Sequence, residues 1–154
     1  KGEIIAKMNS LVDPEIIKLL YLASQTGVKI SLIVRGICCL YPQKKYLSEN
    51  IKVISIIGHF LEHSRIFWFS NNNDPEVYIG SADWMRRNLD RRIEAVTPIE
   101  DSKLKAQLYN LLQTYINDNY FCWIMKEDGT YEKQSITSGK NQSQIDLVEK
   151  WQHY

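Results

Sequence analysis

GEIIAKMNSLVDPEIIKLLYLASQTGVKISLIV, residues 2–34, contains two apolar runs of strand length with a helical pattern between them. The two runs are residues 2–8 and 28–34. Asp13 and Pro14 have the order of a helix N-cap and a first helical residue. The helix that they open carries apolar residues on one face, at Ile16, Leu19, Leu20 and Ala23. A strand, a helix and a strand with short links predict a crossover unit that contains two parallel strands.

The rest of the chain continues to mix strands and helices. A second helix is predicted to begin after Asp101, with an apolar stripe at Leu104, Leu108, Leu111, Leu112 and Tyr115. Asn141 or Ser143 is expected to cap a last helix, which carries Ile145, Val148 and Trp151. The other predicted strands are residues 51–57, 64–69, 76–81, 93–99 and, as the final one, 121–125. We therefore predict a single domain over residues 1–154, an α/β sandwich in which helices flank a mixed β-sheet.

Composition and charge exclude several classes of protein. Hydrophobic residues make up 44% of the chain and charged residues 24%, which argues against disordered, collagen-like and membrane-spanning classes. The apolar runs are too short to span a bilayer, and no charged-then-apolar leader opens the sequence. Cys38, Cys39 and Cys122 make a poor disulfide framework and are expected to be reduced thiols. We therefore expect a cytoplasmic protein, and the net charge of +1 indicates no partner by itself.

An arginine and a glycine follow the apolar run at residues 28–34. Gly36 allows the backbone to turn sharply directly after Arg35. In open α/β sheets, ligands bind beyond the carboxyl ends of the strands, where Arg35 would meet an anion. The alternative is an arginine that reaches into solvent because its strand ends there. This pattern alone leaves both interpretations open.

A histidine and an arginine flank the start of the predicted strand at residues 64–69. If Ser64 begins that strand, His63 and Arg65 point to the same side of the sheet. A neutral imidazole can attack phosphorus or pass a proton, and a guanidinium beside it would stabilise negative charge on phosphoryl oxygens. Ser81 and Asp83 follow the neighbouring predicted strand and add a hydroxyl and a carboxylate. We interpret this set as a functional site.

Four arginines gather within seven residues, at Arg86, Arg87, Arg91 and Arg92. They form either a solvated loop, with salt bridges to Asp83, Asp90 and Glu94, or a clamp for a polyanion. Guanidinium groups bind phosphate oxygens in a two-pronged fork, which is the physical basis of the clamp interpretation, whereas the solvated loop is the commoner arrangement in proteins generally. Composition alone does not choose between the two.

A metal site within the chain is not predicted. His59 and His63 are four residues apart with Glu62 between them, but no third ligand is evident and the glutamate is misplaced for a zinc protease. Cys38 and Cys39 have the wrong spacing for a zinc knuckle. The sequence also lacks the glycine-rich phosphate loop and the dinucleotide-binding turn.

Two family resemblances arise from these motifs. The pair His63 and Arg65, with Gly80-Ser81-Ala82-Asp83, resembles the phospholipase D motif His-x-Lys followed by Gly-Ser-x-Asn. A longer match, over about residues 7–128, is to the histidine-dependent polyphosphate kinases. Its blocks are AKMNSLVD (6–13), LIVRGIC (32–38), FLEHSRI (60–66) and SADWMRRNLDRRIE (81–94). The chain is thus similar to the last catalytic domain of that family, whose fold is phospholipase D-like.

The resemblance implies a reaction and residue roles. The family transfers the terminal phosphate of ATP to polyphosphate, reversibly and with Mg²⁺, through a phosphohistidine in the preceding domain, which also holds the magnesium ligands. Arg35 and His63 match nucleotide- and phosphate-binding residues, His63 being the partner catalytic histidine, and Arg65 is expected to bind ATP or phosphate with them. The polyphosphate path would be lined by Ser81, Asp83, Arg86, Arg87, Arg91 and Arg92. Expected partners are ATP, ADP, polyphosphate, the preceding domains and further copies of the enzyme, but no nucleic acid.

Some features depart from the family or leave alternatives open. His59 stands where many relatives carry an arginine, residues 41–45 lack the expected glycines, and the segment after Asp128 has no strong match. The full-length enzyme is expected in the cytoplasm, with association with the inner membrane compatible with the resemblance. The rival functions are a phosphodiesterase or nuclease of the phospholipase D type and a non-catalytic module that binds polyphosphate.

Overall fold

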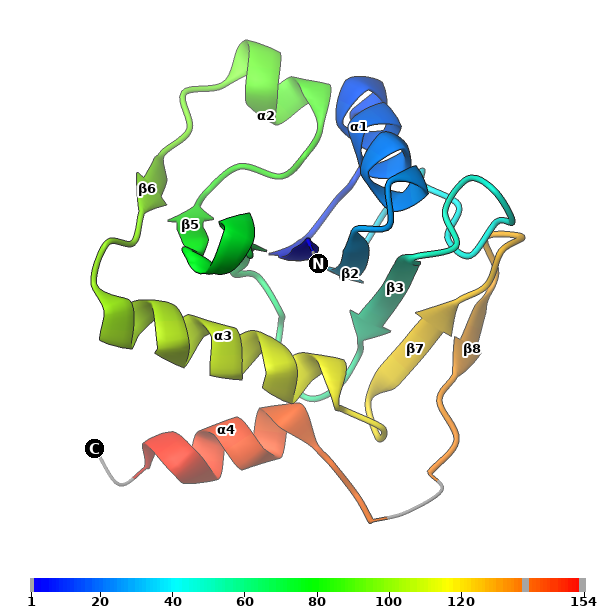
Figure 1. The fold of residues 1–154 in the computed structure, drawn as a ribbon. Coiled ribbons are helices and arrows are strands. Elements are labelled where there is room, and N and C mark those ends of the chain that lie inside the picture. Colours follow the sequence, from blue (N-terminus) through cyan, green and yellow to red (C-terminus); the bar gives the residue numbers. More distant parts are fainter. Residues whose placement is uncertain (1, 137–138, 153–154) are drawn as a thin grey trace.

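The apolar runs of the sequence pair into one eight-stranded mixed sheet, in the order β6-β5-β4-β1-β2-β3-β7-β8. This computed structural model describes residues 2–136 and 139–152 (Figure 1). The strands are β1 (Glu3–Met8), β2 (Lys29–Val34), β3 (Ile51–Ile56), β4 (Arg65–Phe69), β5 (Glu76–Gly80), β6 (Val96–Pro98), β7 (Cys122–Met125) and β8 (Tyr131–Lys133). The predicted crossover unit is confirmed, because β1 and β2 are parallel, with Ala6 opposite Leu32. β3 also runs parallel to β2, whereas the other neighbouring pairs are antiparallel.

Helices cover both faces of this sheet, as predicted for an α/β sandwich. They are α1 (Pro14–Gln25), α2 (Arg86–Arg91), α3 (Ser102–Ile116) and α4 (Ser143–Trp151), with a short 3₁₀ turn, η1 (Asn71–Asn73). Alternate side chains of β1 face opposite ways. Ala6 joins Ile17 of α1 in one hydrophobic core, and Ile5 joins Leu112 of α3 in the other. Figure 1 shows α1 on one side of the sheet and α3 with α4 on the other.

The two long helices begin where the sequence predicts, because an aspartate caps each of them. The Asp13 carboxylate accepts hydrogen bonds from the amides of Glu15 and Ile16, and Asp101 accepts one from Leu104. The predicted buried face of α1 is partly wrong. Leu20 is buried and Ile16 and Ala23 pack against the core as predicted, but Leu19 is 63% exposed, and Ile17 and Ser24 are buried as well. The helix is therefore rotated relative to the stripe that we predicted.

Several predicted bounds and faces need correction in the second half of the chain. Residues 86–91 form the short helix α2 rather than a loop, and only Val96–Pro98 of the strand predicted at 93–99 is paired. The predicted final strand is not the last, since the turn at Asp128-Gly129 leads into β8. On α4, Val148 and Trp151 are 39% and 51% exposed, and the packed residues are Ile145 and Leu147.

Candidate functional site

The topology brings four segments to one edge of the sheet. β1 and β2 are parallel, so the residues that follow them, Asn9 and Arg35, lie at the same edge. β4 runs antiparallel to β1, which places its first residue, Arg65, at that edge too. β5 pairs with β4 so that Gly80 lies opposite Arg65, and Asp83 follows at once. Residues from four distant parts of the chain therefore meet.

Hydrogen bonds join five of these residues into one chain, which we call the edge network: Arg35, Asn9, Asp83, Arg65 and His63. Arg35 Nε donates to Asn9 Oδ1 at 2.9 Å. The backbone amide and Nδ2 of Asn9 both donate to Asp83 Oδ1, at 2.7 and 3.4 Å. Arg65 Nε and Nη2 donate to the two oxygens of Asp83, at 3.1 and 3.2 Å. Arg65 Nη1 then lies 2.9 Å from His63 Nδ1 and donates to the His63 carbonyl oxygen at 2.8 Å.

Asp83 is the buried centre of the edge network, with 6% of its surface exposed. Burial by itself would raise the pKa of this carboxyl group. The hydrogen bonds from Arg65 and from the backbone amides of Asn9 and Ser10, together with the charge of Arg65, outweigh burial and hold the Asp83 pKa below its ordinary value. Asp83 is therefore ionised at neutral pH and fixes Arg65 in place.

The two ends of the edge network face solvent. Arg35 and His63 are exposed, whereas the side chain of Arg65 is only 12% exposed. A guanidinium group can only donate, so the imidazole nitrogen that Arg65 contacts acts as an acceptor. The network thus presents a guanidinium at one end and an imidazole at the other, the two groups through which an incoming anion would be bound.

Asn9 and Lys7 are members of the site that the sequence did not reveal. Asn9 directly follows a parallel strand, which is a signal that could have identified it, because polar residues at such ends often bind ligands. Lys7 gave no such signal, since it lies inside an apolar strand. Its side chain is buried and pairs with Glu62 at 3.0 Å.

The arginine cluster lies on and just after α2, which begins three residues after Asp83. Arg86, Arg87, Arg91 and Arg92 are all exposed. Within residues 2–136 and 139–152, none of them forms an ion pair, so the salt bridges to Asp83, Asp90 and Glu94 that the solvated-loop alternative included are not found. Ser81 donates to the carboxylate of Glu94 and accepts from the amide of Ala95 at 3.1 Å. Hydrogen bonds from Ser81 and Asn88 lower the pKa of Glu94.

The histidine at position 59 does not join this edge network. His59 is exposed, and its ring packs edge-on against Phe121 with 5.5 Å between the ring centres. In the part of the chain that the structure describes, no group of three or more His, Cys, Asp or Glu side chains is arranged to hold a metal ion.

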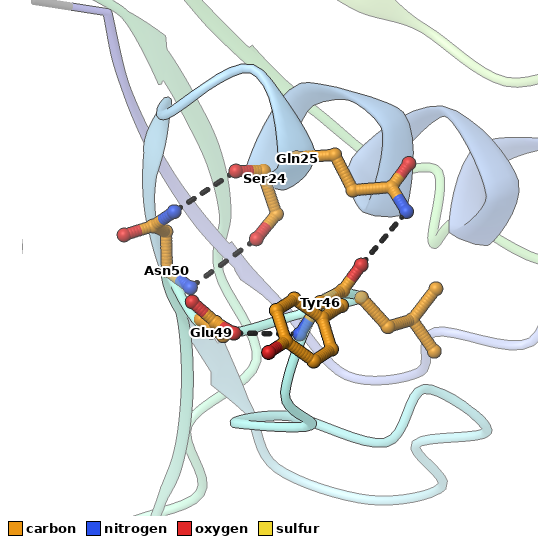
Figure 2. A pocket seen from close by; sticks show the side chains of 6 residues that line it. Ser24, Gln25, Tyr46, Glu49 and Asn50 are labelled. Atoms are coloured by element: carbon orange, nitrogen blue, oxygen red, sulfur yellow. Dashed lines mark hydrogen bonds between the residues drawn. The ribbon is translucent and has the colours of Figure 1, made fainter.

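Two surface pockets adjoin the ends of the edge network, and a third lies away from it. One, of about 230 Å³, lies beside Arg35 and is lined by Gly36, Ser55, Ile57, Trp123 and Tyr131. Another, of about 370 Å³, lies beside His63, between residues 60–64 and α4. The third (Figure 2) lies where β2 and β3 begin, far along the strands from Arg35. There Asn50 donates to Ser24 through its backbone amide and its side chain, and the side chain of Gln25 donates to the Tyr46 carbonyl oxygen. These hydrogen bonds hold a loop against α1.

The fold belongs to the phospholipase D-like class. A phospholipase D family member, Nuc from Salmonella typhimurium, superposes with a TM-score of 0.58 at 18% identity, over 86% of this chain and 82% of that one. The crystal structure of polyphosphate kinase from Porphyromonas gingivalis superposes far better, with a TM-score of 0.94 at 38% identity, over 99% of this chain and 24% of that one.

Sequence comparison identifies the family. The polyphosphate kinase C-terminal domain 2 family matches residues 1–144. The polyphosphate kinase of Prochlorococcus marinus (strain MIT 9313) is 60% identical over 153 residues, which is 98% of this chain and 22% of that protein. The chain belongs to the polyphosphate kinase family, as its C-terminal domain 2. It spans about a fifth of the length of the curated relatives that it matches.

Proposed function

We propose that this chain supplies one half of the active site of a longer enzyme that reversibly transfers the terminal phosphate of ATP to inorganic polyphosphate. The observation that carries the proposal is that Arg35 and His63, both exposed, lie at one sheet edge and end a single hydrogen-bonded network. Phosphoryl transfer requires positioning and positive charge around the phosphoryl oxygens. A guanidinium and an imidazole at one edge meet that requirement.

Each member of the edge network has a distinct role in this proposal. Arg35 and His63 contact the phosphates of the nucleotide, and His63 is the catalytic residue of this half-site. Arg65 holds His63 through its contacts with the imidazole and the carbonyl oxygen of that residue, and it adds positive charge beside the imidazole. The proposed role of Asp83 is to hold Arg65 and not to line the polyphosphate path. Asp83 is buried, and its carboxylate would repel polyphosphate.

The phosphohistidine and the Mg²⁺ ligands are assigned to the preceding domain of the enzyme. The carboxylates at the site of this chain do not fit a magnesium ion, because Asp83 is occupied by Arg65 and Glu62 by Lys7. Mg²⁺ would neutralise charge on the nucleotide phosphates, and the side chains of this chain would contact the same phosphates from the other side. We therefore expect the isolated chain to have no turnover.

The arginine cluster on α2 is the proposed polyphosphate path. Its four guanidinium groups are exposed and unpaired within the described residues, which leaves their donors available for phosphate oxygens. Ser81 lies two residues before Asp83 and five before Arg86 in the sequence, and its hydroxyl is bound to Glu94. The exposed charge of the cluster supports the clamp interpretation.

The proposed partners follow from the family. They are ATP, ADP, polyphosphate, the preceding domains and further copies of the full-length enzyme. We assign the enzyme to the cytoplasm, with association of the full-length protein with the inner membrane compatible with the family. No helix of the described residues has both the length and the apolar character that crossing a bilayer requires.

The test is turnover of the full-length enzyme with Arg35→Ala or His63→Ala. Each change should lower ATP-dependent polyphosphate synthesis by roughly tenfold to a thousandfold, as the loss of one transition-state donor does elsewhere. Lys103→Ala, an exposed cation at the start of α3, is the matched control and should keep the wild-type rate. A wild-type rate in either site variant would contradict the proposed site.

The same preparations separate the rival functions. Metal-independent cleavage of a phosphodiester by this chain alone would favour a phosphodiesterase of the phospholipase D type. Tight binding of polyphosphate by the full-length protein without any turnover would favour a binding module.

A further inference from the structure

A fully buried lysine lies directly behind the proposed catalytic histidine. Lys7 is on β1, where it pairs with Ile66 of β4, and its residue surface is 1% exposed. A charged ammonium group is costly to bury unless it is paired and hydrogen-bonded. Lys7 cannot reach an anion in solution, so any role of its ammonium group lies inside the protein.

Every hydrogen of the Lys7 ammonium group has an acceptor, and each acceptor flanks His63. Nζ lies 3.0 Å from Glu62 Oε2, 2.8 Å from Ser64 Oγ and 3.4 Å from the Ser64 carbonyl oxygen. Glu62 precedes His63 in the chain and Ser64 follows it. One buried cation therefore restrains the chain on both sides of the histidine.

Two helices complete this arrangement around Glu62. Gln144 of α4 donates to Glu62 Oε1 at 2.8 Å, and it also bonds to the amide and the carbonyl of Phe60. The Tyr115 ring of α3 lies 4.9 Å from Lys7 Nζ. Burial, and then the negative charge of Glu62, raise the pKa of Tyr115, which keeps its hydroxyl protonated. The residues before His63 are thus fixed from the sheet and from both helices.

We propose that Lys7 and Glu62 are positioning residues, a buried ion pair that holds His63 in the orientation in which Arg65 contacts it and phosphate can reach it. The inference rests on the proposed function of His63. Lys7 acts through its contacts with Glu62 and Ser64, the two residues that flank His63. Its removal should therefore cost activity only while the imidazole is present.

The experiment is a double-mutant cycle in the full-length enzyme between Lys7→Met and His63→Ala. Because small misplacements of catalytic groups reduce rates strongly, Lys7→Met should lower kcat by about tenfold to a hundredfold. In the His63→Ala background, the same change should alter the residual rate by less than about twofold. Where the His63→Ala rate is too low to measure, the cycle is built on the Kd for ATP instead.

Lys29→Met is the matched control. Lys29 also lies on a central strand and pairs with a glutamate at the same distance, 3.0 Å from Glu3, but its side chain is 72% exposed. This variant should stay within about twofold of the wild type in both backgrounds.

If Lys7→Met fails to fold, Gln144→Ala tests the restraint on the residues before His63 without leaving a charge unpaired. This variant should give the same non-additive double-mutant cycle with His63→Ala. Equal losses from Lys7→Met or Gln144→Ala with and without His63 would overturn the positioning role while leaving the proposed function intact. A His63→Ala enzyme with the wild-type rate would overturn both.

Discussion

Arg65 and Asp83 meet in a two-pronged ion pair, with Nε 3.1 Å from Oδ1 and Nη2 3.2 Å from Oδ2. Their side chains are 12% and 9% exposed. The pairing of β4 with β5 brings them together across 18 residues of sequence. An arginine that its motif marks as a phosphate ligand is thus already held by a carboxylate of the same domain, and the groups left facing solvent are Arg35 and His63.

Asp83→Asn should loosen the edge network because it removes the charge that holds Arg65. The change should lower the local free energy of opening by about 1–3 kcal/mol. In the full-length enzyme, amide hydrogen exchange at Asn9, which donates to Asp83, should then be roughly fivefold to a hundredfold faster. Asp90→Asn, an exposed position on α2, is the control. Unchanged exchange at Asn9 would show that the pair contributes little.

The stability that Asp83 contributes should depend on pH in a defined direction. Its pKa in the folded protein lies below the ordinary value of 3.8, so its contribution is fully present above that value. The contribution is lost as the pH falls through the lowered pKa. The difference in opening free energy between wild type and Asp83→Asn should therefore be constant from pH 7 to about 5 and shrink below about pH 4. A difference that stays the same at pH 3 would contradict this.

Gly58→Ala should disturb the segment that carries His63. A β-carbon at position 58 would lie 2.9 Å from a ring carbon of Phe121 and would overlap the side-chain oxygen of Gln144. Overpacking of this kind costs about 1–3 kcal/mol. We expect lower thermal stability and a lower turnover of the full-length enzyme. Leu61→Ala, at a side chain that is 68% exposed in the same segment, should change neither by much and serves as the control.

Neutralising the arginine cluster should weaken polyphosphate binding and flatten its dependence on salt. Replacing Arg86, Arg87, Arg91 and Arg92 with glutamine should lower the affinity of the full-length enzyme about tenfold or more, because four exposed contacts are removed together. The measurement is the Kd for polyphosphate at two salt concentrations. The matched control removes four exposed lysines elsewhere, at Lys18, Lys45, Lys103 and Lys133. Equal weakening in both variants would indicate a general charge effect.

The parts of the fold that sequence could predict are those governed by neighbours along the chain. The apolar runs around Ala6 and Leu32 form parallel strands, and Asp13 caps the helix between them, as the local pattern indicated. The meeting of His63 with Arg65 could also be inferred, since they are two residues apart.

The remaining features of the fold and the site depend on contacts between residues that are far apart in the sequence, and no local pattern predicts them. Lys7 lies in an apolar run, and the acceptors that allow its burial are more than fifty residues away. Leu19 fits a helical stripe, but the rotation of α1 on the sheet leaves it exposed. The strand β8 is short, with Tyr131, Glu132 and Lys133 all exposed, so it has no apolar period, and only its hydrogen bonds with β7 define it.

The hydrogen bonds from Gln144 to Phe60 join residues that are 84 positions apart in the chain. At ordinary rates of protein synthesis, the ribosome needs about 4 to 17 seconds to add that many residues. During that interval the segment around His63 has been synthesised, but the helix that restrains it has not. The half-site is therefore completed only after α4 has been synthesised, and a chain that ends before α4 would carry the histidine but lack its support.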